Sequence, residues 1–322
     1  MNKIKEFVGI DISKDYFDVV YPNGKYDRFA NSMKGFRIFE KTLNGNAHCV
    51  MERTGRYYES LAFYLKERGI IVTVENALVI KRFVQMHLKV TKTDKADAKM
   101  IQLYAEVFQP KEWIAPKKSI LQSKELCALS NQLKKQKTAL HNQLHSIKVS
   151  GRGGEVSKQI IQRQIKSINQ DLKVIEKEIE ALIKVDYQDL LTLLKSIPGI
   201  GKQTAILLIV YTNGFDNFEN SKQLISYFGF APMIKESGSS VRGQSNISKA
   251  GNRKMRSQLY ICAWSASKHN QSCRNMYERM LNKGKSKNKA LIAVCNKLLK
   301  QALAVAQSQM PYDSNFKSIK PM

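Results

Sequence analysis

The sequence contains few acidic residues for its length. It holds 27 Asp and Glu against 53 Lys and Arg in 322 residues, which leaves a formal charge of +26 at pH 7. Such an excess favours a polyanionic partner over a neutral small molecule, and nucleic acid is the first candidate. Because the length exceeds what one hydrophobic core usually organises, we expect two domains, with an extended element between them.

Long apolar runs are also missing. The longest, from Ala205 to Tyr211, is much shorter than the roughly 20 residues that a membrane-spanning helix needs. The opening segment MNKIKEF lacks the apolar core of a signal peptide. We therefore expect a cytoplasmic protein without a membrane partner.

Neither the cysteines nor the histidines have the spacing of a metal site. No two of the five cysteines form a CxxC pair, and their odd number indicates reduced thiols. His141 and His145 stand four residues apart, but they lie in a Gln- and Lys-rich stretch that is typical of a solvated helix face. We expect no zinc site there.

Strand and helix signals alternate in the first hundred residues. Apolar patterning predicts strands at residues 7–12, 16–21, 25–30, 48–52 and 70–74, and helices at about 32–43, at 57–68, from 77 and from 95. This order, βββαβαβα, is the ribonuclease-H-like arrangement, a mixed sheet flanked by helices. The predicted catalytic domain spans residues 1–110.

Two long helices are predicted for residues 111–185. After Pro116 the composition shifts to Lys, Gln, Glu and Leu, and apolar residues recur at steps of three and four on both sides of a Gly-rich turn. The pattern predicts an antiparallel coiled-coil hairpin roughly 40 Å long, suited to packing within one chain or to assembly. Its expected seam is Leu126, Leu129, Leu133, Leu140, Leu144 and Ile147, then Ile161, Ile165, Ile168, Leu172, Ile175, Ile179 and Leu182.

The remaining part, residues 186–322, is predicted to be mostly helical. Its segment IPGIGKQTA predicts a helix-hairpin-helix element, in which backbone N–H groups near Gly199, Gly201 and Lys202 meet a phosphate at a helix N-terminus. An ordinary turn between helices is the alternative.

Positive charge is concentrated at the C-terminal end of the chain. After Ser237 only Glu278 and Asp313 are acidic. This composition predicts a phosphate-binding surface, and no segment has the donor pattern of a base-reading helix. The expected contacts are Arg242, Lys249, Arg253, Lys254 and Arg256.

Four acids stand at positions that suggest chemistry. Asp11 interrupts the apolar strand FVGIDI, and Glu52 ends the apolar strand HCVME, where burial is costly without a cation. Asp94 and Asp97 share one face at the start of a helix. The first and fourth strands of a ribonuclease-H-like sheet are neighbours, so we expect the four carboxylates to face one point. They would match two Mg²⁺ ions, which stabilise the attacking and leaving oxygens of a phosphodiester displacement.

A plainer interpretation of the helical pair is N-terminal capping. Acids at this end of a helix are favoured by its dipole, whatever else they do. Two further acids, Asp15 and Asp18, lie close to Asp11 in the sequence, and we expect both at the surface.

The residues around the four acids resemble a known family. GIDISKD around Asp11, ERTGRY around Glu52 and KTDKADA around Asp94 and Asp97 resemble the RuvC-like domain of the DEDD insertion-sequence transposases of the IS110 type, which include Piv-like DNA invertases. FENSKQLISYFGFAP, ESGSSVRG and ISKAGNRKMRSQLY resemble the family's second domain, the serine transposase domain. The resemblance covers nearly the whole chain.

The resemblance implies a DNA recombinase that joins covalently to DNA through a serine. The family motif places this serine before a glycine, which here is Ser237. A serine hydroxyl is a weak nucleophile, so activation by carboxylate-bound Mg²⁺ is chemically sensible. The chain departs from the family pattern at Arg53 and Glu236, and Ser239 and Ser240 are alternative nucleophiles.

The resemblance also implies partners. Family members take their target from a structured bridge RNA, and recombination of several strands requires a homo-oligomer, a dimer or a tetramer. We accordingly expect DNA and a bridge RNA as partners, and a location at the bacterial nucleoid. Two other functions stay open: a structure-specific endonuclease or resolvase that uses metal-activated water, and a non-catalytic architectural protein whose acids are helix caps.

Overall fold

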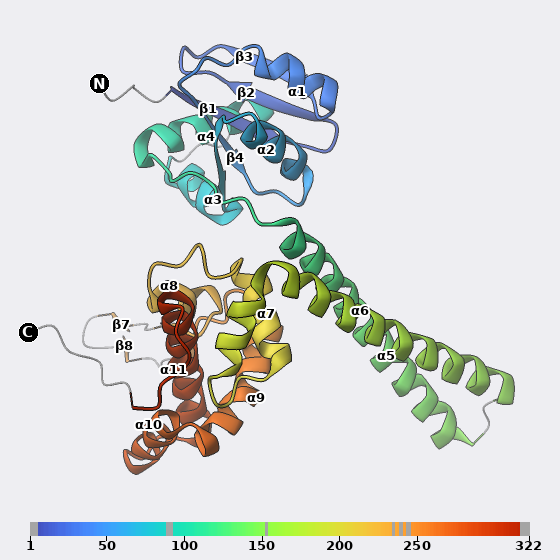
Figure 1. The fold of residues 1–322 in the computed structure, drawn as a ribbon. Coiled ribbons are helices and arrows are strands. Elements are labelled where there is room, and N and C mark those ends of the chain that lie inside the picture. Colours follow the sequence, from blue (N-terminus) through green and yellow to red (C-terminus); the bar gives the residue numbers. More distant parts are fainter. Residues whose placement is uncertain are drawn as a thin grey trace, which may run out of the picture. The chain divides into compact units, whose positions relative to one another are not determined.

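The computed structural model describes residues 6–87, 93–151, 154–233, 236–237, 241–242 and 246–315. The chain divides into two compact units, Met1–Ala115 and Pro116–Met322 (Figure 1). The first is a mixed α/β unit, and the second consists mainly of helices. The long helical hairpin therefore groups with the C-terminal helices, and its standing as a separate domain stays a prediction.

A five-stranded mixed sheet organises the first unit, in the order β3-β2-β1-β4-β5. The central strand, β1, pairs antiparallel with β2 and parallel with β4. The expectation that the first and fourth strands are neighbours is therefore confirmed. This sheet is consistent with a ribonuclease-H-like domain. The strands are β1 (Glu6–Ile12), β2 (Tyr16–Val20), β3 (Tyr26–Ala30), β4 (Ala47–Glu52) and β5 (Ile71–Glu75).

The two faces of this sheet pack against different helices. Val8 and Ile10 belong to a core shared with α1 (Met33–Glu40) and α2 (Tyr57–Glu67). Phe7 and Val50 belong to a second core with α3 (Ala77–Met86) and α4 (Asp94–Phe108). Because strand side chains alternate between faces, Asp11 shares the α4 face with Phe7, and Glu52 shares it with Val50.

Helix α4 approaches β1 closely at Gly9. A Cβ atom on this residue would lie 2.3 Å from the carbonyl oxygen of Ala98 and 2.4 Å from the backbone nitrogen of Gln102. The backbone of α4 therefore rests directly on the strand. This close contact fixes the height at which the first turn of α4 stands above the sheet.

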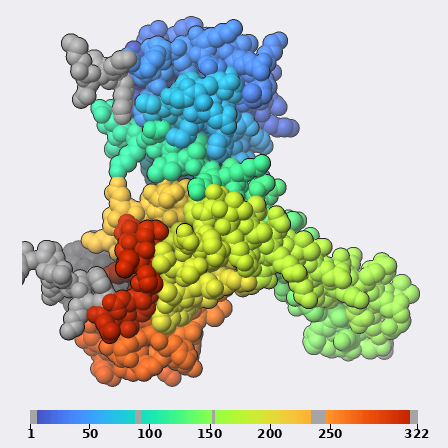
Figure 2. Space-filling model, viewed as in Figure 1, coloured from blue at the N-terminus to red at the C-terminus, as the bar shows by residue number. Residues whose placement is uncertain are grey.

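The second unit begins with the hairpin of α5 (Lys118–Ser150) and α6 (Glu155–Lys195). The helices lie side by side, and Figure 2 shows the turn end of the hairpin standing clear of the other helices of this unit. The seam differs from expectation at Leu129, which is 44% exposed, and at Leu182, whose neighbour Ile183 is fully buried instead. A straight helix drifts from a strict seven-residue repeat, which accounts for the shift toward Ile183.

Helix α6 is interrupted near its end. Tyr187 has φ −137° and ψ 26°, outside the helical region. The part that follows packs into the main core of the second unit through Leu190, Leu191 and Leu194. The break thus separates the hairpin portion of α6 from its core portion.

The main core of the second unit is formed by buried residues of several helices, such as Leu259 and Leu298. None of the helices in the described part of the chain is long and apolar enough to cross a membrane. All five cysteines are free and buried, as expected. The helices are α7 (Lys202–Thr212), α8 (Ser221–Tyr227), α9 (Arg253–His269), α10 (Gln271–Asn282) and α11 (Lys287–Ser308).

Two small sheets interrupt this helical part and were not expected. Strand β6 (Pro232–Met233) pairs with β9 (Asn246–Ile247), and β7 (Glu236–Ser237) pairs with β8 (Val241–Arg242). Strands of two residues are too short to show the alternation by which sequence patterns reveal a strand.

We predict that Gly9→Ala destabilises the first unit by about 1 to 3 kcal/mol, because the added methyl group meets backbone atoms that cannot rotate away. Chemical denaturation of purified protein measures this change. Gly45→Ala is the control, because a Cβ there meets nothing within 4 Å. Equal stability of the two variants would contradict the close contact between α4 and β1.

Candidate active site

A row of charged side chains crosses the α4 face of the sheet. Asp18 on β2 is the register partner of Asp11 on one side and of Arg28 on the other. Glu52 stands one position beyond the last β1–β4 pair, next to Asp11, and is the register partner of Glu75. We call these five residues the charged row. Its order across the sheet is Arg28, Asp18, Asp11, Glu52 and Glu75.

Helix α4 adds Asp94 and Asp97 to this region. Both lie in its first turn, and the N-cap is Thr93, whose hydroxyl accepts a hydrogen bond from the backbone nitrogen of Ala96 at 3.2 Å. The side-chain cap is thus supplied by Thr93, although the helix dipole still favours both acids. Neither acid therefore serves as the N-cap residue of α4.

Asp11 titrates well above an ordinary aspartate. Its burial raises the pKa most, followed by the negative charges of Asp97, Glu52, Asp18 and Asp94, and together they bring the pKa from 3.8 to about 7. A carboxyl in such surroundings gains from a nearby cation. The donors around it are carboxylate oxygens, the ligands that Mg²⁺ prefers, so this set of residues chemically fits a divalent metal ion.

Arg28 supplies positive charge at one end of the charged row. Its Nε lies 2.9 Å from Oδ1 of Asp18, and its Nη2 lies 2.7 Å from Oδ2 of Asp94. The hydrogen bond to Asp18 is the main cause of a raised Arg28 pKa. Arg28 therefore ties β3, β2 and the first turn of α4 together.

The expectation that Asp18 lies at the surface is wrong. The residue is only 3% exposed, and it accepts hydrogen bonds from Arg28 and from the Tyr26 hydroxyl. Alternation along β2 turns it toward α4, and these donors offset the cost of its burial. Asp15, in the turn before β2, is exposed as expected.

The carboxylates are neighbours, but they do not form a finished metal cage. In the described ranges, no three His, Cys, Asp or Glu side chains are placed to hold one metal ion. Asp94 is bound to Arg28, and Glu52 accepts a hydrogen bond from the Thr54 hydroxyl at 2.8 Å. The four acids therefore lie near one another without converging on one metal position, and Asp94 pairs with Arg28. Their joint role in holding a metal ion stays a prediction.

Sequence reasoning missed Asp18, Arg28 and Glu75 as members of this region. Each side chain stands on the face of the sheet that packs against α4. Once the strand order was known, the alternation of side chains along each strand could have shown this. Glu75 accepts hydrogen bonds from the Tyr104 hydroxyl at 2.8 Å and from the backbone nitrogen of Asn76 at 2.7 Å. It anchors α4 to the sheet.

The turn before α7 matches the expected position of a phosphate contact. Gly201 is the N-cap of α7 and provides no side-chain cap. Gly199 has φ +103°, and a Cβ there would lie 2.6 Å from the Cβ of Ala266, so only glycine fits. Lys202 is held by Glu180 at 2.7 Å. The uncapped backbone is thus more available to an anion than the Lys202 side chain.

The start of α9 collects positive charge. Lys249, Arg253 and Lys254 are exposed, and the first turn contains no acid. Cations at the positive end of a helix are unfavourable, so a bound anion would stabilise this arrangement. Arg256 differs from these exposed side chains, because its Nη1 donates to the carbonyl oxygens of Phe228 and Ala250.

The expected nucleophile belongs to the small sheet β7–β8. Ser237 pairs with Val241, and Glu236 pairs with Arg242. The structure describes the backbone of these residues and not their side chains. The alternatives Ser239 and Ser240 lie outside the described residues.

We predict that the metal-free protein loses stability as the pH rises from about 4 to about 7. In this window the folded state keeps the Asp11 proton that the unfolded state has lost, so the free energy of unfolding falls with pH. One titrating group contributes at most about 1.4 kcal/mol per pH unit. Urea denaturation in EDTA measures the slope, and Asp11→Asn should flatten it.

Asp15→Asn is the matched control, since this exposed carboxylate lies in the adjacent turn. It should leave the slope unchanged. Mg²⁺ should raise the melting temperature of the wild type at pH 8 and have little effect on Asp11→Asn. A Mg²⁺ effect of equal size in both proteins would contradict metal binding at Asp11.

Two family models match this chain. One is described as "Transposase IS116/IS110/IS902 family" and matches residues 191–278. The other, for the DEDD domain of IS110 elements, is described as "Transposase" and matches residues 8–147. The second match includes β1, β4 and α4, which carry the candidate acids.

Curated relatives match over similar lengths. The pilin gene-inverting protein of Moraxella lacunata is 31% identical over 328 residues, which covers 96% of this chain and 98% of that protein. The protein of the same name from Moraxella bovis is 31% identical over 326 residues, with the same coverage. An uncharacterized 43.6 kDa protein of insertion element IS110 from Streptomyces coelicolor is 27% identical over 148 residues, 46% of this chain and 36% of that protein. The chain therefore belongs to the IS116/IS110/IS902 family of transposases, enzymes that act on DNA.

Proposed function

We propose that this chain is a metal-dependent DNA recombinase that cuts and rejoins strands at the ends of a mobile or invertible DNA segment. The observation that carries the proposal is Asp11, a half-buried carboxyl whose pKa is raised first by its burial and then by acids from α4, β4 and β2. Crowded carboxylates of this kind are costly unless a cation joins them. The names of the two Moraxella relatives support inversion as one form of the reaction.

In this proposal Asp11, Glu52, Asp94 and Asp97 hold Mg²⁺, and their four negative charges match two ions. When bound, the metal would stabilise the attacking and leaving oxygens of the phosphodiester. The chain itself sets the positions of the ligands. Asp11 and Glu52 are fixed on neighbouring strands, and Asp94 would have to leave its ion pair with Arg28 or share it in order to bind the metal.

Ser237 is the proposed nucleophile. Its hydroxyl oxygen forms a bond to phosphorus while the bond from phosphorus to a deoxyribose oxygen breaks. The serine gives up its proton, and the released deoxyribose oxygen takes one, so the number of phosphoester bonds is conserved. Reversal of this step with another strand end rejoins the DNA without an external energy source. The family motif around Ser237 supports this assignment.

The second unit would hold the DNA backbone. The uncapped start of α7 at Gly201 lies beside an open hollow of about 370 Å³, which leaves room for a phosphate. Lys249, Arg253 and Lys254 add exposed positive charge, and Arg242 follows the serine motif. These features support a helix-hairpin-helix contact that does not depend on base sequence.

The choice of DNA site would come from a bridge RNA, with the complex assembled as a dimer or tetramer in the nucleoid. The formal charge of +26 is larger than contacts with a few DNA phosphates require, and this excess supports the binding of RNA as a second polyanion. In this arrangement residues 1–110 cut, residues 111–185 connect or assemble, and residues 186–322 hold DNA and carry Ser237.

We predict a covalent protein–DNA adduct that resists denaturant and disappears in Ser237→Ala. The adduct is measured as a shifted band after incubation of the protein with Mg²⁺, its guide RNA and labelled DNA sites. Ser239→Ala and Ser240→Ala are matched controls from the same SGSS sequence and should retain the adduct. DNA cleavage by Ser237→Ala without any adduct would instead support the endonuclease that uses metal-activated water.

We also predict that a discrete RNA copurifies with the protein and directs recombination. Sequencing of the bound RNA, followed by recombination of plasmids that carry the matching sites, measures both properties. Asp11→Asn should retain the RNA and lose recombination, because it changes the metal site alone. Recovery of only random cellular RNA would contradict guidance by RNA.

A further inference from the structure

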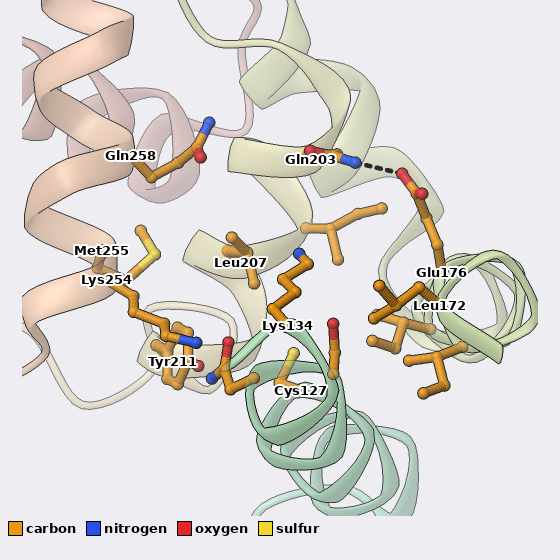
Figure 3. Close-up of a pocket in the computed structure, with 15 residues that line it drawn as sticks. Cys127, Lys134, Leu172, Glu176, Gln203, Leu207, Tyr211, Lys254, Met255 and Gln258 are labelled. Carbon is orange, nitrogen blue, oxygen red and sulfur yellow. Dashed lines mark hydrogen bonds between the residues drawn. The ribbon is translucent and has the colours of Figure 1, made fainter. Parts of the chain in front are cut away.

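A cavity of about 290 Å³ opens between α5, α6, α7 and α9, entirely within the second unit (Figure 3). Its interior is apolar and is formed by the buried side chains of Cys127, Ile175, Ile179, Ile206 and Met255. A void lined in this way is close in size to common small-molecule sites. Neither the acids of the first unit nor the serine motif takes part in it.

Two lysines from different helices line the same cavity. Lys134 of α5 and Lys254 of α9 are both exposed, so they stand at its mouth. Within the described part of the chain, neither ammonium group has a carboxylate partner. Partial burial, together with the charges of Lys134 and Lys135, lowers the pKa of Lys254. The lining also contains one carboxylate, Glu176, so its two lysines leave a net positive charge that favours an anionic ligand.

Polar groups line the opposite side. Figure 3 shows Gln203 bonded to Glu176 of α6, with Gln258 on α9 across from them. The Gln258 amide donates to the hydroxyl of Thr204 at 3.0 Å, which leaves its carbonyl oxygen as an acceptor. Such groups match the edge of a nitrogen heterocycle. An acyl chain would leave the Gln258 carbonyl oxygen without a donor, whereas a base N–H group can supply one.

We propose that this cavity binds one nucleoside phosphate unit, with the base in the apolar interior and the phosphate between Lys134 and Lys254. The inference rests on the proposed function, because the expected source is an unpaired nucleotide of a bound DNA or RNA strand. Lys254 continues the positive start of α9, so a strand held there could place a base in the cavity. A free nucleotide offers the same chemistry.

The test compares two strands of equal charge. One is a single-stranded oligonucleotide with bases, and the other is a fully abasic strand of the same length. The wild type should bind the first at least about tenfold more tightly, because burying or stacking one base contributes about 1 to 3 kcal/mol. Leu207→Trp fills the cavity, so it should reduce this preference about tenfold and leave the affinity for the abasic strand unchanged.

A charge variant keeps the test decisive if Leu207→Trp does not fold. Lys254→Gln should weaken binding of the base-bearing strand severalfold more than Lys135→Gln, a neighbouring lysine of α5 that does not line the cavity. Each of AMP, CMP, GMP and UMP is also added to the full-length protein in a thermal shift assay. A rise in melting temperature that Lys254→Gln abolishes, without a preference between strands, would assign the cavity to a free nucleotide.

The remaining outcomes separate this inference from the proposed function. If folded Leu207→Trp keeps the base preference, and Lys254→Gln matches Lys135→Gln, the cavity assignment is wrong, although the protein still binds nucleic acid. If the wild type binds neither strand nor any mononucleotide, nucleic-acid binding itself fails, and both proposals fall.

Discussion

The contact between α4 and β1 is the constraint on which the candidate active site depends. Gly9 allows the backbone of α4 to rest on the strand, and this height brings Asp94 and Asp97 within electrostatic range of Asp11. A larger residue at this point would lift the helix and separate the charges. The same contact that completes the core of the first unit therefore also creates the electrostatic strain of the site.

Arg28 balances that strain in part. It joins Asp18 and Asp94, two acids from different elements, and so replaces repulsion by attraction at one end of the charged row. The other end has Glu75, held by Tyr104 of α4. Asp11 and Glu52 lie between Arg28 and Glu75 in the charged row. In the hydrogen bonds described above, neither of them is paired with an arginine or a tyrosine. The metal proposal concerns this central part of the row.

Much of the fold followed from local patterns. The apolar segments FVGIDI and HCVME identified β1 and β4, and the ribonuclease-H-like order placed them side by side, as observed. Asp18 and Arg28 were missed because their meaning depends on strand register, which no single segment encodes. The ion pair between Asp94 and Arg28 was equally hidden, since it joins residues 66 positions apart. The two-residue strands around Ser237 carry too little pattern to predict.

The arginine at the edge of the sheet has a consequence for how the protein matures. Because the Arg28 guanidinium neutralises part of the acidic cluster, less charge repulsion opposes folding of the first unit when no metal ion is bound. A metal ion held as proposed above would then bind to a unit that is already folded, and the stability that it adds would follow its free concentration.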